Sequence, residues 1–230
     1  MSDALQKAKE EVLWGCRLMV ERGYLLGTGG NLSARADGTD LVVITPTSLP
    51  YDTMTEEDLV VVNLNGEIVS GKHQPSIECS MHLGVYRARP ELRALVHTHS
   101  KYATTVSLIK ELDIMPAIDT EQSLYLGGDI NIVPFAFPGS KELAEYVKEG
   151  IGTNATRLLT ALPNPAHSSG IFVYRAISMK DAVIASDIIE RNSEMYLLLK
   201  AGGFDYKPMT EDYKVFVKEK SKKKRQVISA

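Results

Sequence analysis

The chain has 230 residues, with 26 Lys and Arg against 29 Asp and Glu, so its formal net charge at pH 7 is −3. This length can bury a substantial core in one domain over residues 1–230, and the balanced charge excludes a global basic field that would recruit nucleic acid or anionic lipid. No apolar run approaches the roughly 20 residues that span a bilayer, no signal peptide is evident, and two cysteines suit a cytoplasmic protein without a disulfide framework.

Helices and strands alternate along the chain without an evident linker. Hydrophobic periodicity and capping residues predict a helix over 5–19, a strand over 41–44, strands over 59–64 and 67–69, a helix over 75–89, a strand over 95–99, a helix over 101–110, a strand over 130–135, a helix over 140–150, strands over 157–160 and 171–174, and a helix over 178–201. Ser76, Ser140 and Ser178 are the expected N-caps. From about residue 214 a lysine-rich tail begins, which predicts a solvated end.

Two histidines alternate at the end of a predicted strand. His97 and His99 follow the apolar pair Leu95-Val96. Residues i and i+2 of a strand point the same way, about 7 Å apart, so two imidazoles can converge on one cation. Imidazole suits zinc and neighbouring metals. The pattern is also compatible with a hydrogen-bonded, half-exposed pair, so its surroundings have to decide.

Three polar segments precede this histidine pair. The glycine-rich run at 27–31 can aim backbone N–H groups at an anion, or it can be a flexible turn. Hydroxyl groups at 45–48, after a strand, can bind phosphate oxygens or shape a turn. The segment 75–78 opens a predicted helix, where N–H groups and the helix dipole favour an anion.

Glu78 belongs to the last of these segments. In the first turn of a helix it can simply complement the dipole, or it can ligate a metal and move a proton. His82 stands four residues later on the same predicted helix face. We interpret His82 as a core histidine, or one that supports the site, rather than as a ligand.

The ordered set Gly-Thr-Gly-Gly-Asn-Leu-Ser, Thr-Pro-Thr-Ser, Pro-Ser-x-Glu and Val-His-Thr-His-Ser resembles the class II aldolase/adducin family, from about Ala4 to Gly203. The resemblance implies a three-layer α/β/α fold with a mostly antiparallel central sheet. It also implies a homotetramer with one Zn²⁺ per subunit at subunit interfaces. The implied reaction is retro-aldol cleavage of a ketose 1-phosphate, a sugar phosphate, into dihydroxyacetone phosphate and an aldehyde.

The resemblance also implies residue roles. His97 and His99 match the paired zinc ligands, and Glu78 matches the catalytic glutamate that also ligates zinc without substrate. The phosphate-binding positions of the family correspond to Gly30, Asn31, Thr47, Ser48, Ser76 and Ile77. Ile77 departs from the usual serine and keeps only its backbone N–H. If Glu78 is not the base, the next candidate catalytic residue is Tyr213, which could enter from a neighbouring subunit.

The third zinc histidine is the main departure from the family pattern. The family has His-Gly in a strand-turn-strand segment, whereas this chain has a longer segment in which Ser169 precedes Gly170. His167 is the nearest histidine. Either the loop bulges so that His167 ligates zinc, or the site has two histidines and binds weakly.

Relatives of the same fold offer alternative functions. Ribulose-phosphate 4-epimerases resemble this chain in the histidine pair, but they carry aspartate where Glu78 stands, and their catalytic aspartate would fall near Leu124. A methylthioribulose-1-phosphate dehydratase is a third enzymatic alternative. A non-catalytic adducin-like scaffold is the alternative from another class, and it would not need Glu78 together with both histidines. These differences favour an aldolase.

Overall fold

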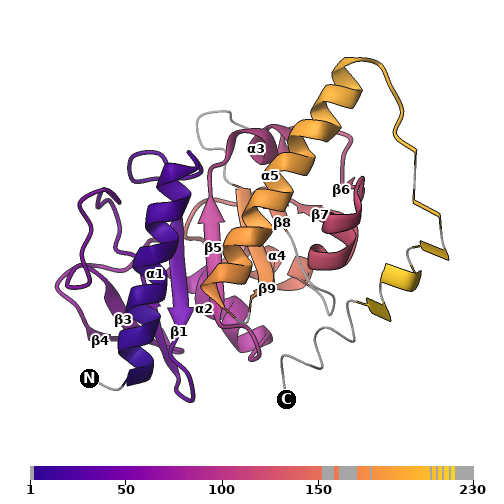
Figure 1. Ribbon diagram of the computed structural model, residues 1–230. Helices are drawn as coiled ribbons and strands as arrows, with labels where there is room; N and C mark the ends of the chain where they lie inside the picture. Colours follow the sequence, from indigo (N-terminus) through magenta and orange to yellow (C-terminus); the bar gives the residue numbers. More distant parts are fainter. Residues whose placement is uncertain are drawn as a thin grey trace.

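The computed structural model of the protein describes residues 3–151, 158–160, 170–176, 178–207, 209–210, 212–213, 215–217 and 219–220 (Figure 1). Its elements are α1 (Asp3–Glu21), β1 (Asn31–Arg35), β2 (Leu41–Ile44), β3 (Val60–Asn63), β4 (Ile68–Ser70), α2 (Cys79–Ala88), β5 (Ala94–Thr98), α3 (Lys101–Ser107), β6 (Ile114–Met115), the π-helix η1 (Gln122–Leu126), β7 (Ile130–Val133), α4 (Lys141–Ile151), β8 (Leu158–Thr160), β9 (Gly170–Ala176) and α5 (Met179–Ala201).

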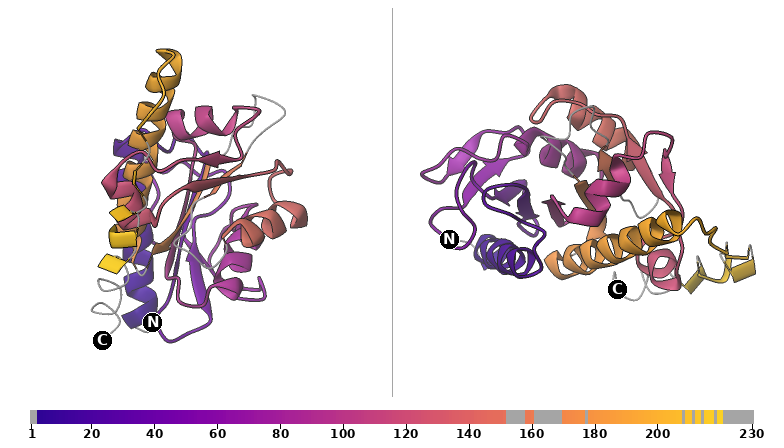
Figure 2. Two further views of the ribbon diagram at one scale, coloured as in Figure 1. Left: turned by 90° about the vertical axis from the view of Figure 1, so that its right-hand side faces the viewer. Right: turned by 90° about the horizontal axis from the view of Figure 1, so that it is seen from above.

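Six strands form an antiparallel sheet in the order β4-β3-β2-β1-β5-β9. A smaller sheet, β6-β7-β8, pairs β7 and β8 in parallel. Helices α1 and α5 lie side by side on one face of the large sheet, and α2 and α4 pack against the other (Figures 1 and 2). The described part of the chain therefore has the predicted α/β/α layers around a mostly antiparallel sheet.

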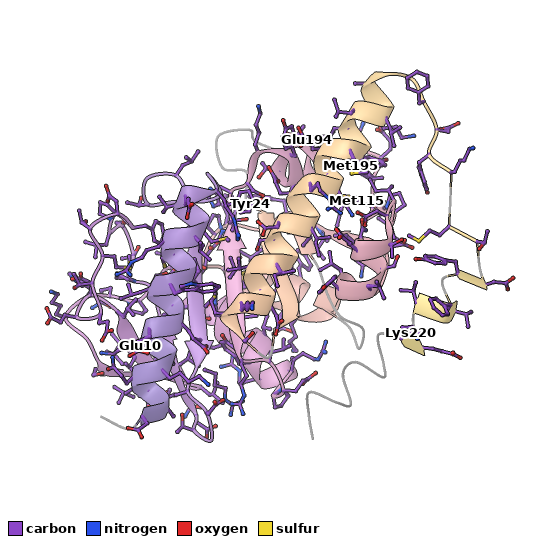
Figure 3. All side chains as sticks on the ribbon, viewed as in Figure 1. Glu10, Tyr24, Met115, Glu194, Met195 and Lys220 are labelled. Carbon is purple, nitrogen blue, oxygen red and sulfur yellow. The ribbon has the colours of Figure 1, made fainter. Side chains whose placement is uncertain are left out.

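Side chains of the central strands alternate between two cores, as the pleat requires. Val43 and Val61 join the core under α1 and the start of α5, whereas Val42 and Val62 join the core under α2 and α4. A third cluster, which includes the fully buried Met115, packs α3, η1 and β7 against α5 (Figure 3). Polar side chains lie where β1 begins, at Asn31, and where β5 ends, at His97 and Thr98.

Long-range polar contacts join the layers. The Tyr24 hydroxyl, in the loop after α1, donates to Asp187 of α5 at 3.2 Å (Figure 3). The buried Glu190 carboxylate, also on α5, accepts the backbone N–H groups of Tyr102 and Ala103 at 2.8 and 2.9 Å. Because α3 is short and starts next to His99, this contact fixes the chain directly after the histidine pair.

The expected caps of α4 and α5 are confirmed, since Ser140 and Ser178 accept the N–H of the third helical residue at 3.0 and 3.2 Å. The expected cap of α2 is wrong. This helix begins at Cys79 with Glu78 at the N-cap, because the preceding residues form an extended bridge and a turn instead. In that turn the Ser76 hydroxyl accepts the backbone N–H of Glu78 at 3.3 Å.

The hydrophobic pattern does not predict β1, β6 or η1. β1 follows the glycine-rich run directly, and β6 has only two residues. Two elements end two or more residues earlier than predicted, α3 at Ser107 and β7 at Val133. None of the described helices has the length and apolar character that crossing a membrane requires.

Candidate active site

The end of β5 brings the two predicted histidines together. His97 lies in β5 on the face of Leu95, toward the α2–α4 core, and His99 follows the strand. Their Nε2 atoms are 3.2 Å apart and their ring centroids 5.0 Å apart. The backbone N–H of His99 donates to the carbonyl of Tyr24 at 3.0 Å. The rings therefore converge, as the strand alternation predicts.

Glu78 joins the histidines from the start of α2. Its Oε2 atom lies 3.1 Å from Nε2 of His97, and the two residues are 4% and 1% exposed. Glu78 is the N-cap residue, but its side chain makes no capping hydrogen bond. The carboxylate faces His97 instead, which leaves it available for metal binding or proton transfer.

Asn31 and His82 complete a buried polar cluster around this carboxylate. β1 pairs with β5 so that Asn31 stands opposite His97. The Asn31 amide Nδ2 donates to Oε2 of Glu78 at 2.7 Å, and its Oδ1 lies 2.5 Å from Nε2 of His82. The other ring nitrogen of His82 lies 2.6 Å from the Ser33 hydroxyl. The Asn31 side chain, predicted to bind phosphate, thus contacts Glu78 directly.

Burial and charge shift the acid–base equilibria of the cluster. Burial by itself raises the pKa of Glu78, but its interactions with His97, the Asn31 amide, His82 and His99 together outweigh burial, so the pKa of Glu78 is lowered. Burial lowers the pKa of His82 to about 3, and burial together with His97 lowers that of His99 to about 4. At neutral pH these two rings are neutral, and a neutral imidazole has a lone pair for a metal ion.

The three predicted phosphate segments meet at one place. Pro46 and Pro75 form an antiparallel bridge, the N–H of Thr47 donates to the carbonyl of Gln74, and the N–H of Ser76 donates to the carbonyl of Thr45, both at 3.0 Å. The Thr45 hydroxyl accepts the N–H of Leu32 in β1 at 3.2 Å, which ties both segments to the glycine-rich run.

The hydroxyl groups in this region differ in accessibility. Ser48 is exposed and has a left-handed φ of 57°, and the neighbouring Thr47 is half-buried. Ser76 is 6% exposed, whereas the Ile77 side chain is 63% exposed. An anion would therefore meet neutral hydroxyl and N–H donors here.

Gly30 allows the glycine-rich run to approach the histidine strand. Its φ is 83°, and a Cβ atom would lie 2.6 Å from the His97 carbonyl oxygen and 2.4 Å from a methyl carbon of Leu25. The Gly30 carbonyl accepts a short hydrogen bond from the Tyr51 hydroxyl. A side chain at this position would displace the backbone next to His97, so the site requires glycine here.

Tyr213 makes its described contacts outside this cluster. The Tyr213 hydroxyl lies 2.9 Å from that of Thr120, beside η1, and its ring packs near Phe216. Its predicted role from a neighbouring subunit stays a prediction. His167 lies outside the described residues, so its predicted role as a zinc ligand also stays a prediction.

The donor set around Glu78 fits zinc chemically but is incomplete. Two imidazole nitrogens and a carboxylate oxygen are common zinc ligands, and ligands about 2.05 Å from a tetrahedral zinc lie roughly 3.4 Å apart. The separations of 3.1 and 3.2 Å are close to that value. No three His, Cys, Asp or Glu side chains of the described residues enclose a metal position by themselves. Glu78, His97 and His99 therefore need a further ligand or a small rearrangement.

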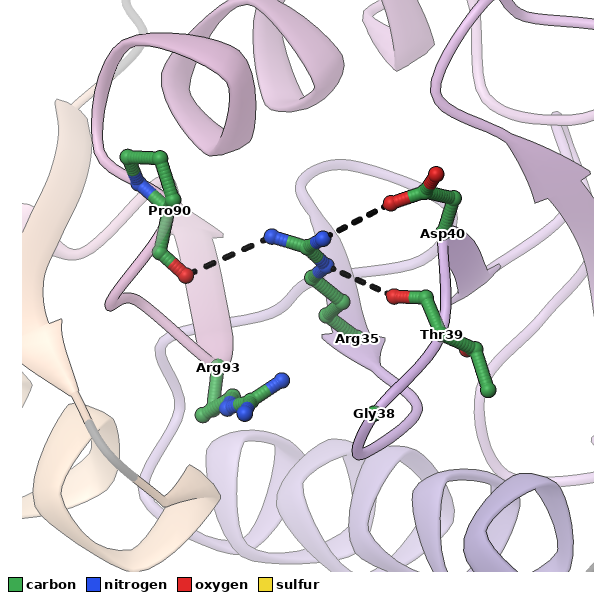
Figure 4. A pocket seen from close by; sticks show the side chains of 6 residues that line it. All are labelled: Arg35, Gly38, Thr39, Asp40, Pro90 and Arg93. Atoms are coloured by element: carbon green, nitrogen blue, oxygen red, sulfur yellow. Dashed lines mark hydrogen bonds and ion pairs between the residues drawn. The ribbon is translucent and has the colours of Figure 1, made fainter.

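A polar pocket of about 270 Å³ lies at the opposite end of β1 from the Glu78 cluster (Figure 4). Arg35 crosses it and donates to the carbonyls of Thr39 and Pro90 and to the Asp40 carboxylate, at 3.0, 3.3 and 2.9 Å. The other arginine of the pocket, Arg93, pairs with a neighbouring aspartate at 3.2 Å. Because carboxylates balance both guanidinium groups, this pocket is a structural junction.

The sequence from residue 10 to 197 matches the family model described as "Class II Aldolase and Adducin N-terminal domain". The chain belongs to this family. It is 36% identical over 200 residues to a 5-deoxy-D-ribulose 1-phosphate aldolase of Bacillus thuringiensis serovar kurstaki, covering 86% of this chain and 88% of that protein. It is 31% identical to a 3-oxo-tetronate 4-phosphate decarboxylase of Haemophilus influenzae, covering 92% of this chain and 96% of that protein.

Solved structures agree with this class II aldolase assignment. An L-fuculose 1-phosphate aldolase superposes with a TM-score of 0.83 at 29% identity, covering 96% of this chain and 98% of that one. The family resemblance predicted from the ordered motifs is therefore confirmed, and so is the predicted fold. The named aldolases among the relatives support a lyase of the class II aldolase family.

Proposed function

We propose that the protein is a zinc-dependent class II aldolase that cleaves a ketose 1-phosphate into dihydroxyacetone phosphate and an aldehyde. The observation that carries this proposal is the buried contact of Glu78 with His97, next to the Nε2 of His99. A carboxylate and two neighbouring imidazoles can bind one metal cation together. The carboxylate can also transfer a proton.

His97, His99 and Glu78 would hold the metal ion, with His167 as the further ligand. When bound, zinc supplies a Lewis acid that polarises the ketose carbonyl. Glu78 is the proton carrier. Cleavage of the bond between C3 and C4 releases the proton of the C4 hydroxyl and requires a proton at C3. Glu78 would take up a proton and deliver it to the C3 carbon of the dihydroxyacetone phosphate that leaves. Burial of Glu78 keeps bulk water from competing for that proton.

The phosphate would be bound by donors of three segments: Gly30, Asn31, Thr47, Ser48, Ser76 and the backbone N–H of Ile77. Their convergence through the 46–75 bridge supports this role. The Asn31 amide has two N–H groups, and the one not directed at Glu78 can reach a phosphate oxygen. Tyr213 of a neighbouring subunit would exchange the proton of the C4 hydroxyl, as part of a homotetramer.

The remaining parts of this proposal rest on the sequence. We propose one domain over residues 1–230 with a lysine-rich tail from about 214, and a cytoplasmic enzyme of carbohydrate metabolism. The contact of Tyr213 with Thr120 shows one way in which the segment after α5 can sit against η1 of its own chain. Exchange of that segment between subunits is the arrangement that the proposed Tyr213 role requires.

The test is a coupled assay of dihydroxyacetone phosphate release from a panel of ketose 1-phosphates, including L-fuculose 1-phosphate and 5-deoxyribulose 1-phosphate. We expect release from at least one of them, loss of release with a chelator, and recovery with Zn²⁺. Borohydride with substrate should leave activity intact, because no lysine forms a Schiff base in this mechanism. Chelator-resistant activity that borohydride destroys would contradict the proposal.

A second candidate is decarboxylation of a 3-oxo acid phosphate, which the similarity to the Haemophilus influenzae decarboxylase favours because it spans nearly both full lengths. Both reactions break a carbon–carbon bond next to a carbonyl, so the same residues could serve either. Release of CO₂ from 3-oxo-tetronate 4-phosphate, without aldehyde formation from any ketose 1-phosphate, would favour this candidate.

A further inference from the structure

A chain of hydrogen bonds leads from the interior under α2 to the Glu78 carboxylate. Its side chains are those of Tyr86, Ser33, His82, Asn31 and Glu78, and all are 4% exposed or less. The hydroxyls of Tyr86 and Ser33 are 2.9 Å apart, and the next three links measure 2.6, 2.5 and 2.7 Å. The Tyr86 hydroxyl also lies 3.1 Å from the Ser33 carbonyl oxygen, so its single proton is shared between the two oxygens of Ser33. Because these side chains are buried, a polar atom that loses its partner here stays unsatisfied at a cost.

The acceptor at one end fixes the direction of the inner donors. An ionised carboxylate only accepts, so the atom of Asn31 facing Glu78 must be its amide nitrogen. The Asn31 carbonyl oxygen then faces His82 and needs a donor, so Nε2 of His82 carries a proton. In a neutral ring Nδ1 is then an acceptor, and the Ser33 hydroxyl donates to it. Neighbouring hydrogen bonds aligned in this way strengthen one another.

The orientation of the Asn31 amide matters because the group is nearly symmetric in shape. Rotated by half a turn, it would place its carbonyl oxygen against Oε2 of Glu78, and two acceptors would face each other in a buried place. Among the described residues, the contact that holds the Asn31 carbonyl oxygen in place against this rotation is its hydrogen bond with the N–H of His82. Neither Ser33 nor Tyr86 reaches the amide directly.

We propose that His82 is a positioning residue: as the Nε2-protonated tautomer, backed by Ser33 and Tyr86, it holds the Asn31 amide so that its N–H group points at Glu78. This inference rests on the proposed function of Glu78 as proton carrier. His82 touches neither substrate nor metal in this account. Its effect passes through Asn31, which links the interior of the α2–α4 layer to the reacting carboxylate.

The test compares two replacements of His82 in an assay of the proton transfer proposed for Glu78, the exchange of a dihydroxyacetone phosphate proton with solvent. Glutamine extends an amide N–H about as far as Nε2 of histidine, so H82Q keeps the donor, whereas H82L fills the space without one. We expect exchange of a dihydroxyacetone phosphate proton with D₂O to fall about 10- to 100-fold in H82L, the size of a lost hydrogen bond to a charged group. In H82Q it should stay within about threefold of the unmodified protein.

A second measurement does not depend on activity or on H82L folding. Nitrogen-15 NMR of histidine-labelled protein should show His82 with a protonated Nε2 and an unprotonated Nδ1, assigned by the signals that H82Q removes. H73Q is the control, because His73 binds Asp58 near the surface, at 3.1 Å, away from this chain.

Three results would overturn the proposal: the opposite tautomer, equal proton exchange in H82L and the unmodified protein, or equal impairment of H82Q and H82L in folded samples. Absence of proton exchange in the unmodified protein would instead contradict the proposed function. In that case the NMR measurement of the His82 tautomer still tests the hydrogen-bond chain. Failure of the positioning role and failure of the proposed function can therefore be told apart.

Discussion

Replacing Gly30 by alanine tests whether close backbone approach builds the site. The φ of 83° is a left-handed conformation, which costs a residue with a Cβ atom about 1–2 kcal/mol. The added methyl would also lie 2.6 Å from the His97 carbonyl oxygen, and such overpacking costs about 1–3 kcal/mol. We therefore expect G30A to lower the free energy of unfolding by about 2–5 kcal/mol.

Gly27 provides the matched control. Its φ of 61° imposes a similar backbone cost, but no atom lies within 4 Å of the position that a Cβ atom would take. G27A should lose only about 1–2 kcal/mol. Urea unfolding of both variants, metal-free and at one protomer concentration, measures the difference. Because G30A also displaces the backbone of His97, its aldolase rate should fall roughly 100-fold, as for other small misplacements of reacting groups.

Equal unfolding free energies and equal rates for G30A and G27A would refute this reasoning. Such a result would mean that the loop before β1 relaxes away from His97 at no cost. A loss of stability in G30A with an unchanged rate would mean that the close approach of Gly30 to the His97 carbonyl stabilises the fold but is not needed to position His97 for the reaction.

Three further predictions concern single groups of the site. E78Q should fold but lose about 10²- to 10⁴-fold in solvent exchange of dihydroxyacetone phosphate, because a general base is missing; a normal exchange rate would assign the base elsewhere. H167A should lose zinc by metal analysis, and retained zinc would exclude His167 as a ligand. The stability of metal-free protein should fall as the pH drops from 6.5 to 5, and His82 should contribute roughly 1.4 kcal/mol per pH unit. The reason is that the pKa of His82 is lowered in the folded protein, so in this range the unfolded chain binds a proton that the folded protein does not. Urea unfolding should show a smaller slope for H82Q; an identical slope would contradict this. Glu78, with its lowered pKa, contributes a loss only below about pH 4.5, outside this window.

The elements of the site that depend on short-range sequence patterns could be predicted. The alternation of His97 and His99 along one strand is a local property, and so is the position of Glu78 just before a helix. The family motifs place these residues in one set. The structure places the Glu78 carboxylate 3.1 Å from His97 and the two imidazole Nε2 atoms 3.2 Å apart. That these side chains bind a metal stays a prediction.

The contacts of Asn31 depend on strand pairing, which local patterns do not determine. Asn31 reaches Glu78 across 47 positions of sequence because β1 pairs with β5. β1 itself is absent from the predicted elements, although the alternation of polar Asn31 and Ser33 with apolar Leu32 and Ala34 is the pattern of a half-polar strand. With that strand assigned, the shared face of Asn31 and Ser33 could have been inferred.

The predicted Ser76 cap is wrong for a related reason. Pro75 and Ser76 have the composition of a helix start, but the backbone of this segment is already paired with residues 45–47. A tertiary bridge therefore overrides the local capping preference and moves the start of α2 to Cys79. This shift places Glu78 at the helix N-cap, where its side chain is free to face His97.

Metal content and activity measured on the same purified sample test the central claim most directly. We predict about one zinc ion per chain, release of dihydroxyacetone phosphate from a ketose 1-phosphate, and loss of both in H97A with the fold retained. Removing zinc with a chelator should abolish the release, and adding zinc back should restore it. Full activity in protein without metal, or unchanged zinc content in H97A, would contradict the account.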